Sequence, residues 1–152
     1  MHLFVMRHGD AFRQLTNDRE RRLTERGRQE VTVSAGQLVG SNVNLERICC
    51  SPLFRARETA EIVQSLIPCE AEIEVWEEIM PGGRCETVAQ RLNNEPMCAT
   101  LMVSHQPFVG RMIAWLTREE INMDTGMIAC IQANNFDQFC GELEWTGPDT
   151  RY

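Results

Sequence analysis

Short apolar runs alternate with amphipathic helical segments along most of this chain, and this alternation is the feature that most constrains its fold. The apolar runs at 2–6, 46–50 and 100–103, with a weaker one at 72–76, have the length and composition of strands. Strands that alternate with helices form a mostly parallel sheet whose two faces are covered by helices. We therefore expect an α/β protein, a three-layer α/β/α sandwich with a mostly parallel central sheet.

Local capping signals place the helices between these strands. Thr24 is a suitable N-cap for a helix over 24–39. Ser51 as N-cap, with Pro52 at the first helical position, predicts a helix that runs through Leu66. The remaining segments are expected as short helices at 86–94 and 107–116, polar loops at 11–23 and 81–83, and a closing hairpin of strands 127–133 and 139–145 around Asn134-Asn135.

The length of 152 residues suits a single domain with one core, covering 1–152. No apolar run approaches the roughly 20 residues of a membrane-spanning helix. The first strand is followed at once by Arg7, so the N-terminus does not resemble a signal peptide. These features predict a cytoplasmic protein without a membrane partner.

Composition excludes several classes of function. The net charge of −7 argues against a nucleic-acid partner, which calls for a basic face. All basic side chains are Arg, so lysine Schiff-base chemistry is excluded. The cysteines lack the regular close spacing of a zinc site, and we expect no metal. We interpret them as reduced thiols that act as small apolar residues rather than as a redox sensor; they are Cys49, Cys50, Cys69, Cys85, Cys98, Cys130 and Cys140.

Three of the predicted strands lead into polar groups of one chemical kind. The first strand ends at Arg7 and His8, and the fourth ends at His105. The second strand leads to Arg55 on the first turn of the helix that follows. Because the carboxyl ends of parallel strands meet at one edge of a sheet, where α/β proteins bind their ligands, two Arg and two His should converge there.

Such a cluster of basic groups is tolerable only around an anion or with neutral imidazoles. Phosphate is the natural anion, because the planar guanidinium fork matches its oxygens. Helix N-termini near Ser51 and Pro107 add positive potential at the same edge. The neighbouring Arg charges are expected to lower the pKa of His8, and a neutral imidazole has a lone pair that can attack phosphorus.

The residues at these strand ends resemble the histidine phosphatase superfamily, also called the phosphoglycerate mutase-like family. The resemblance covers most of the chain and implies a phosphoglycerate mutase-like fold. Four motifs carry it, in the family's order: Met6-Arg7-His8-Gly9, Leu23-Thr24-Glu25-Arg26-Gly27, Ser51-Pro52-Leu53-Phe54-Arg55-Ala56-Arg57-Glu58-Thr59-Ala60, and Val103-Ser104-His105.

Within this superfamily the chain is most similar to the phosphohistidine phosphatase SixA group. Asp10-Ala11 follows the first motif, where members that act on sugar phosphates usually have Glu-Thr or Glu-Ser. Arg13 stands five residues after His8, where many of those members have Asn. The chain is also short and leaves little room for a lid, which favours a phosphohistidine phosphatase over a sugar phosphatase or mutase.

The resemblance implies a metal-independent phosphatase without a cofactor. His8 is the nucleophile and forms a phosphohistidine that water then hydrolyses. Arg7, Arg55 and His105 bind the phosphoryl group, with His105 protonated when phosphate is bound. Gly9 and Arg13 are further substrate-binding candidates. Glu78 is a candidate general acid for the leaving group, and the alternative is a solvated Glu beside its neighbour Glu77.

A compact chain without a lid predicts an open, shallow site. Such a site suits a phosphohistidine side chain on a signalling or phosphotransfer protein, such as a histidine phosphotransfer domain. Two alternatives stay open, which are a phosphatase of small phosphoesters such as sugar or nucleoside phosphates, and a phosphate-binding module that has lost turnover.

Overall fold

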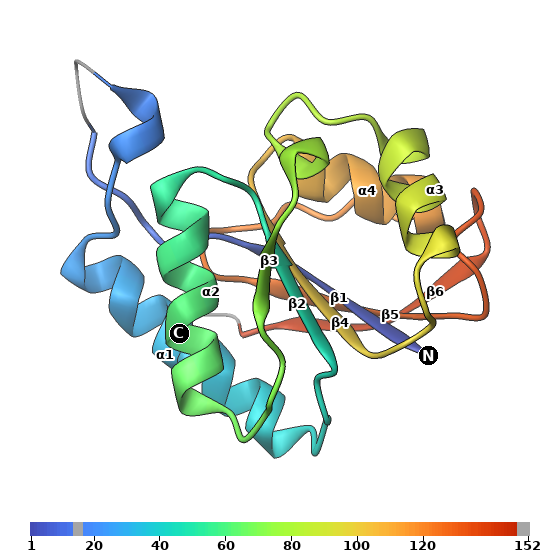
Figure 1. The fold of residues 1–152 in the computed structure, drawn as a ribbon, viewed down its shortest axis with the longest axis horizontal. Helices are drawn as coiled ribbons and strands as arrows, with labels where there is room; N and C mark the ends of the chain where they lie inside the picture. The colour runs from blue at the N-terminus through green and yellow to red at the C-terminus, as the bar shows by residue number, and fades with distance from the viewer. Residues whose placement is uncertain (14–16, 149–152) are drawn as a thin grey trace.

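The computed structural model describes residues 1–13 and 17–148, and these residues form one six-stranded sheet with helices on both faces (Figure 1). The strand order across the sheet is β3-β2-β4-β1-β5-β6. The strands are β1 (His2–Arg7), β2 (Arg47–Cys50), β3 (Ile73–Val75), β4 (Thr100–Ser104), β5 (Ile128–Ala133) and β6 (Gly141–Gly147).

The first four strands are parallel, and the last two are not. β4 pairs in parallel with both β1 and β2, and β2 pairs in parallel with β3. β5 runs antiparallel to β1, and β6 runs antiparallel to β5 as the second strand of a hairpin. The expected sheet, mostly parallel with a closing hairpin, is confirmed.

Four α-helices cover the sheet, two on each face (Figure 1). α1 and α2 pack on one face and α3 and α4 on the other, so the expected three layers are confirmed. No helix within 1–13 and 17–148 is long and apolar enough to cross a membrane. The helices are α1 (Glu25–Gly40), α2 (Phe54–Leu66), α3 (Cys85–Asn94) and α4 (Phe108–Thr117), with short 3-10 turns η1 (Asp18–Glu20) and η2 (Glu77–Ile79).

The central strand β1 shows why the chain forms this sandwich. Leu3 and Val5 point into the core under α3 and α4, and Phe4 and Met6 point into the core under α1 and α2. All four side chains are fully buried. A strand that is apolar on both faces needs a helix layer on each side, because each buried side chain of this size contributes about 1.5–3 kcal/mol.

The expected start of the second helix, with Ser51 as N-cap and Pro52 as the first helical residue, is wrong by two residues. α2 begins at Phe54, with Leu53 in the N-cap position and no side-chain cap. Ser51 does not cap this helix: its hydroxyl accepts the N–H of Leu53 at 3.2 Å and lies 2.5 Å from His105. A serine that bonds two residues ahead favours a turn over a helix, and here the turn frees the hydroxyl for His105.

The segment expected as a loop at 11–23 is not entirely irregular, because its two ends pair with each other through backbone contacts. Ala11 and Leu23 form an isolated antiparallel bridge, and the N–H of Phe12 donates to the carbonyl of Arg22 at 2.9 Å. Thr24 caps α1 as predicted, because its side chain accepts the N–H of Gly27. The two ends of the segment therefore pair with each other between β1 and α1, and η1 lies within it.

Candidate active site

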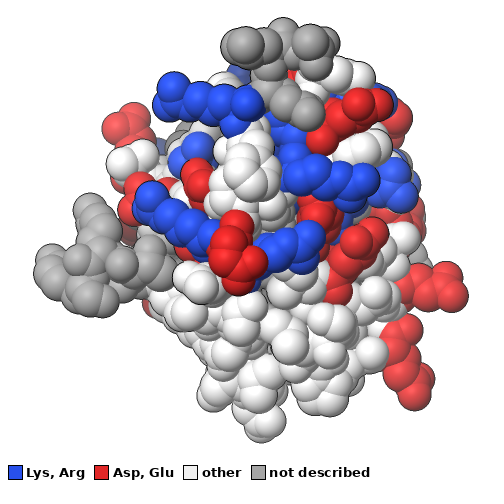
Figure 2. All heavy atoms as spheres, turned by 90° about the vertical axis from the view of Figure 1, so that its left-hand side faces the viewer, with Lys and Arg blue, Asp and Glu red and all other residues white. Residues whose placement is uncertain are grey.

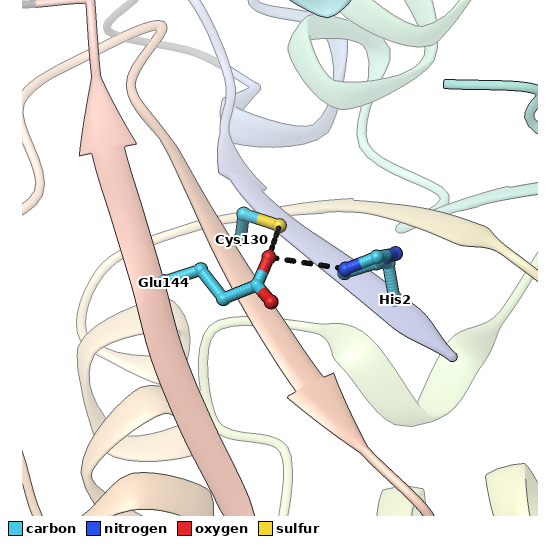
Figure 3. Close-up of side chains that lie close together, drawn as sticks. All are labelled: His2, Cys130 and Glu144. Atoms are coloured by element: carbon cyan, nitrogen blue, oxygen red, sulfur yellow. Dashed lines mark hydrogen bonds and ion pairs between the residues drawn. The ribbon is translucent and has the colours of Figure 1, made fainter. Parts of the chain in front are cut away.

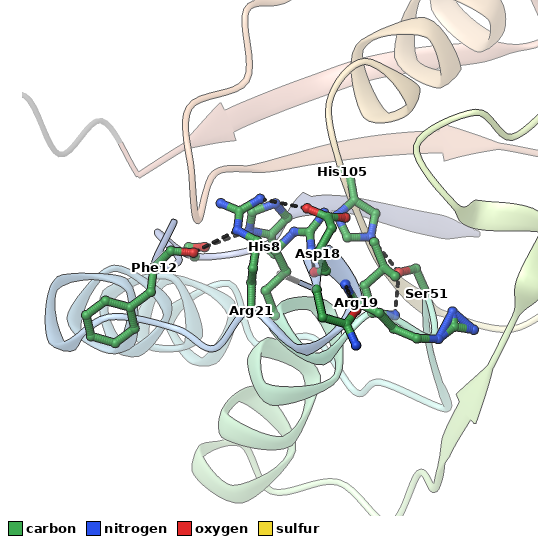
Figure 4. Close-up of polar contacts among 11 residues, drawn as sticks. His8, Phe12, Asp18, Arg19, Arg21, Ser51 and His105 are labelled. Atoms are coloured by element: carbon green, nitrogen blue, oxygen red, sulfur yellow. Dashed lines mark hydrogen bonds and ion pairs between the residues drawn. The ribbon is translucent and has the colours of Figure 1, made fainter. Parts of the chain in front are cut away.

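The sheet register brings the ends of β1 and β4 together. Arg7 pairs with Ser104, and the N–H of His8 donates to the carbonyl of Ser104 at 3.0 Å. The rings of His8 and His105 follow directly, with centroids 5.0 Å apart (Figure 4). Arg55 comes from the first turn of α2, and the predicted convergence of these four residues is confirmed.

The imidazole of His8 is oriented by the backbone of its neighbour Gly9. Its Nδ1 lies 2.6 Å from the carbonyl oxygen of Gly9. A carbonyl only accepts hydrogen bonds, so Nδ1 carries the proton and Nε2 keeps its lone pair. Burial, and after it the charges of Arg55 and Arg7, lower the pKa of His8 to about 4 against the opposing bond to Gly9. The imidazole is neutral at pH 7, and burial contributes more to this than the arginines do.

His105 is held by the hydroxyl of Ser51. Nε2 lies 2.5 Å from Ser51 Oγ, while Nδ1 is buried and has no hydrogen-bond partner within the described residues. Burial, then the proximity of His8 and of Arg55, lower the pKa of His105 to about 2. Both histidines are therefore uncharged until an anion offsets the arginine charges.

Each of the two expected arginines keeps a buried donor for a ligand. Arg7 donates through Nη1 to the carbonyl of Met123 at 3.0 Å, and Arg55 donates through Nη1 to the carbonyl of Asp18 at 2.9 Å. The Nε atoms of both arginines are buried without a partner in the described part of the chain. Since a buried N–H without a partner is costly, these donors favour an anion between them.

Two residues of η1 and its C-terminal flank complete the site and were not foreseen. Asp18 contacts Arg55 at 3.3 Å and Arg21 at 3.1 Å through its two carboxylate oxygens. Arg21 also donates through Nε to the carbonyl of Phe12 at 2.7 Å, so it bridges both arms of this segment (Figure 4). Burial opposes ionisation of Asp18, but the bonds and charges of Arg21 and Arg55 outweigh it and lower the pKa of this carboxyl.

The expectation of an open site needs correction. His8 is only 7% exposed, and part of the cover of the site is the side chain of Asp18 in η1, which pairs with Arg55 (Figure 4). The cover is thin, since the side chain of Asp18 is itself 66% exposed. The site is therefore partly covered rather than open, and its cover includes an exposed side chain.

Two glycines let helix α1 approach this site closely. A Cβ on Gly9 would lie 2.6 Å from the carbonyl oxygen of Gly27, and a Cβ on Gly27 would lie 2.1 Å from the carbonyl oxygen of Asp10. The N–H of Gly9 donates to Thr59 Oγ1 at 3.1 Å. Gly9 was expected to bind substrate, but its amide is engaged inside the protein and its role is close packing behind His8.

Comparison with known proteins identifies the family and the fold. The profile of the histidine phosphatase superfamily (branch 1) matches residues 3–80. The chain belongs to the histidine phosphatase superfamily. Two relatives extend the match: phosphohistidine phosphatase SixA of Escherichia coli (strain K12) is 38% identical over 119 residues, 76% of this chain and 74% of the relative. The SixA homolog of Haemophilus influenzae is 35% identical over 127 residues, 76% of this chain and 77% of the relative.

A solved structure of the same superfamily supports the fold over nearly the whole chain. The structure of the protein histidine phosphatase SixA complexed with tungstate superposes with a TM-score of 0.86 at 34% identity, covering 96% of each chain. The expected phosphoglycerate mutase-like fold is therefore confirmed.

The superfamily resemblance also suggested Glu78 and Arg13, and the structure does not bring these two into the cluster. Glu78 lies in η2 after β3, where its carboxylate accepts from Arg91 Nη1 at 2.7 Å. The guanidinium of Arg91 lies in turn over the ring of Trp76 at 3.9 Å. Arg13 is exposed and directly precedes residues 14–16, which are outside the described part of the chain.

The face of this phosphatase fold that carries η1 and the starts of α1 and α2 is rich in arginine. Figure 2 shows Arg side chains spread over the upper half of this face, with acidic groups between them. Arg22 and Arg28 both pair with Glu58, which also accepts the N–H of Leu23. An acidic protein thus presents many of its arginines on the face around the site.

Proposed function

We propose that this chain is a phosphohistidine phosphatase that works through a covalent phosphohistidine at His8. The neutral, buried imidazole with its lone pair on Nε2, set among Arg7, Arg55 and His105, is the observation that carries this proposal. Nε2 attacks phosphorus, the new N–P bond forms, and the bond to the leaving group breaks. Water then attacks the phosphoenzyme and releases phosphate.

The fixed cations and donors stabilise the transferred group. Charge in the transition state is spread over the equatorial oxygens of phosphorus, so catalysis depends on positioning and electrostatics. Arg7 Nε, Arg55 Nε and His105 Nδ1 are buried donors that can satisfy these oxygens. A bound dianion raises the pKa of His105 from its low value, so His105 gains a proton when phosphate binds. The guanidinium charges supply what a metal ion would otherwise provide.

The incoming phosphoryl group takes the place of a carboxylate. Asp18 pairs with Arg55 in the structure, and a phosphoryl oxygen competes for the same guanidinium. Arg21 lies beside this position and can follow the anion, because its Nη1 also pairs with Asp18. The protein thus keeps the buried charge of Arg55 paired in the absence of substrate.

The chemistry of the leaving group determines how strongly hydrolysis depends on Glu78 as a general acid. A histidine side chain leaves as an imidazole, whose conjugate acid has a pKa near 6.5, and so departs more readily than an alkoxide. Glu78 remains a candidate acid, although its carboxylate is bound to Arg91. Hydrolysis of phosphohistidine needs this acid less than hydrolysis of a phosphoester does.

The proposed substrate is phosphohistidine on another protein, such as a histidine phosphotransfer domain. Two relatives that bear the SixA name, the thin cover over His8 and the arginine-rich face around it support this choice. A large partner can present one phosphohistidine side chain to His8 without being enclosed itself. The second candidate is a phosphatase of small phosphoesters, which the same nucleophile would serve.

Labelling with a phosphodonor tests the proposed chemistry. Incubation with a ³²P-phosphohistidine protein should give an acid-labile phosphoenzyme and free phosphate, both lost in His8→Ala. His2→Ala is the matched control, since His2 lies at the other end of β1. Binding without turnover would instead make the chain a phosphate-binding module. Faster turnover of sugar or nucleoside phosphates than of phosphohistidine proteins would favour the second candidate.

A further inference from the structure

Three side chains with metal-binding atoms meet on the sheet, away from the phosphate site. They are His2 on β1, Cys130 on β5 and Glu144 on β6 (Figure 3). His2 Nε2 lies 3.0 Å and Cys130 Sγ lies 3.6 Å from Glu144 Oε2, and all three ligand atoms lie within 4.8 Å of one another. His2 begins β1 and Arg7 ends it, roughly 17 Å further on at ~3.3 Å per residue, so the cluster plays no part in catalysis.

The register of the sheet brings these residues to one face. Cys130 pairs with Phe4, and His2 and Phe4 lie on the same side of β1, so His2 and Cys130 are diagonal neighbours. A β-bulge supplies the third residue: Cys130 pairs with Trp145 and Ile131 pairs with Leu143, which leaves Glu144 as the extra residue. A bulge re-aims a side chain, and here it turns Glu144 toward Cys130.

We propose that His2, Cys130 and Glu144 form a Zn²⁺ site. Imidazole, thiolate and carboxylate are the ligands that zinc takes in proteins, at about 2.0–2.3 Å. Ligand atoms of a tetrahedral zinc complex with these bond lengths lie roughly 3.3–3.8 Å apart. The observed separations of 3.0 and 3.6 Å are within half an ångström of this range. Rotation of exposed side chains closes the remaining gap between sulfur and imidazole.

The three side chains differ in exposure in the way that a metal site at the protein surface requires. Cys130 is 2% exposed and forms the floor, while the side chains of His2 and Glu144 are 40% and 39% exposed and form the walls. The metal enters from solvent, and a water molecule supplies the fourth ligand on the open side. The thiol donates to Glu144 before zinc arrives, and zinc replaces that proton, which passes to solvent as the Zn–S bond forms.

The charges of the proposed complex balance. A thiolate and a carboxylate carry two negative charges against the two positive charges of zinc, and the imidazole is neutral. The metal would join β1 to the edge strand β6 across β5, and so fasten the closing hairpin to the start of the chain. The spacing of cysteines along the sequence does not reveal such a site, because its three ligands come from three strands that are distant in sequence.

Zinc titration against a chromophoric chelator tests the site, using the full untagged chain with its thiols reduced. We expect one Zn²⁺ per chain and an affinity at least tenfold weaker in each of His2→Gln, Cys130→Ser and Glu144→Gln. Cys140→Ser, which removes an exposed thiol elsewhere, should leave the affinity unchanged. Co²⁺ should give a thiolate charge-transfer band in the wild type that Cys130→Ser loses.

Stability provides the second readout. Zinc at a hundredfold excess over its dissociation constant should raise the melting temperature of the wild type by roughly 8 °C, and the same zinc concentration should raise that of His2→Gln by about half as much or less. His2 is exposed enough for this variant to fold, which keeps the test valid if Cys130→Ser does not fold. Zinc binding that survives in His2→Gln and Glu144→Gln, or that is lost in Cys140→Ser, would overturn the proposal, as would the absence of a one-to-one complex.

Discussion

Replacement of Asp18 by asparagine tests whether its carboxylate competes with phosphate for Arg55 and Arg21 or instead holds Arg55 in place. Asp18 pairs with Arg55 at 3.3 Å and with Arg21 at 3.1 Å. Asn keeps the size of the side chain and the backbone carbonyl that accepts from Arg55 at 2.9 Å, but removes the charge. If the carboxylate competes with phosphate for these arginines, the variant should bind phosphate more tightly.

The size of the effect follows from the exposure of the pair. The side chain of Asp18 is 66% exposed, so each ion pair is worth about 0.2–1 kcal/mol rather than the larger value of a buried pair. Loss of both gives about 1 kcal/mol in favour of the bound anion. Because 1.4 kcal/mol corresponds to a factor of ten, the inhibition constant for phosphate should fall about fivefold.

The assay is inhibition by inorganic phosphate of the hydrolysis of a phosphohistidine protein, at low and at high salt. The difference in the inhibition constant between Asp18→Asn and the wild type should shrink at high salt, since exposed charges are screened. Glu20→Gln is the matched control, because Glu20 is an exposed acidic residue of the same short turn. An inhibition constant that is unchanged or higher in Asp18→Asn would refute the competition and show that Asp18 instead holds Arg55 in place.

Three further predictions follow from the site. Glu78→Gln should slow phosphoserine hydrolysis more than phosphohistidine hydrolysis, and equal losses in parallel rate measurements would argue against its role as an acid. The pKa of about 4 for His8 lies below the usual 6.5, so the unfolded chain takes up the proton first as pH falls. In urea unfolding, His8 should therefore contribute about 2 kcal/mol to the loss of stability at pH 5, in addition to the loss from His105, whose pKa is also lowered, and the fall should be shallower in His8→Gln. Gly27→Ala places a Cβ 2.1 Å from a backbone oxygen and should cost about 2–4 kcal/mol, whereas Gly36→Ala, with open space around it, should be neutral or stabilising.

Local patterns in the sequence determined the fold class and the centre of the site. Apolar runs, helix periodicity and Thr24 as a cap are local signals, and they placed the strands and α1 close to their observed bounds. His8 and His105 were foreseen because each follows a strand, and parallel strands bring their ends to one edge. The start of α2 was not foreseen, because the hydroxyl of Ser51 bonds to His105, which is far away in the sequence.

Tertiary structure alone decided what surrounds that centre. Asp18 and Arg21 lie in a segment without periodicity, and only the contact of η1 with α2 brings Asp18 to Arg55. Burial, which no motif encodes, is the main cause of the low pKa of His8. Local residue types therefore determined which groups reach the sheet edge, and tertiary packing decided the burial and the neighbours of these groups.

The cluster of His2, Cys130 and Glu144 depends on the sheet in the same way. It needs both the strand order of the sheet and one bulge in β6. A shift of one residue in a strand register turns every side chain to the other face, and sequence spacing contains no record of that choice. The sequence determined that these side chains can bind a metal, and the register of three strands decided that they meet.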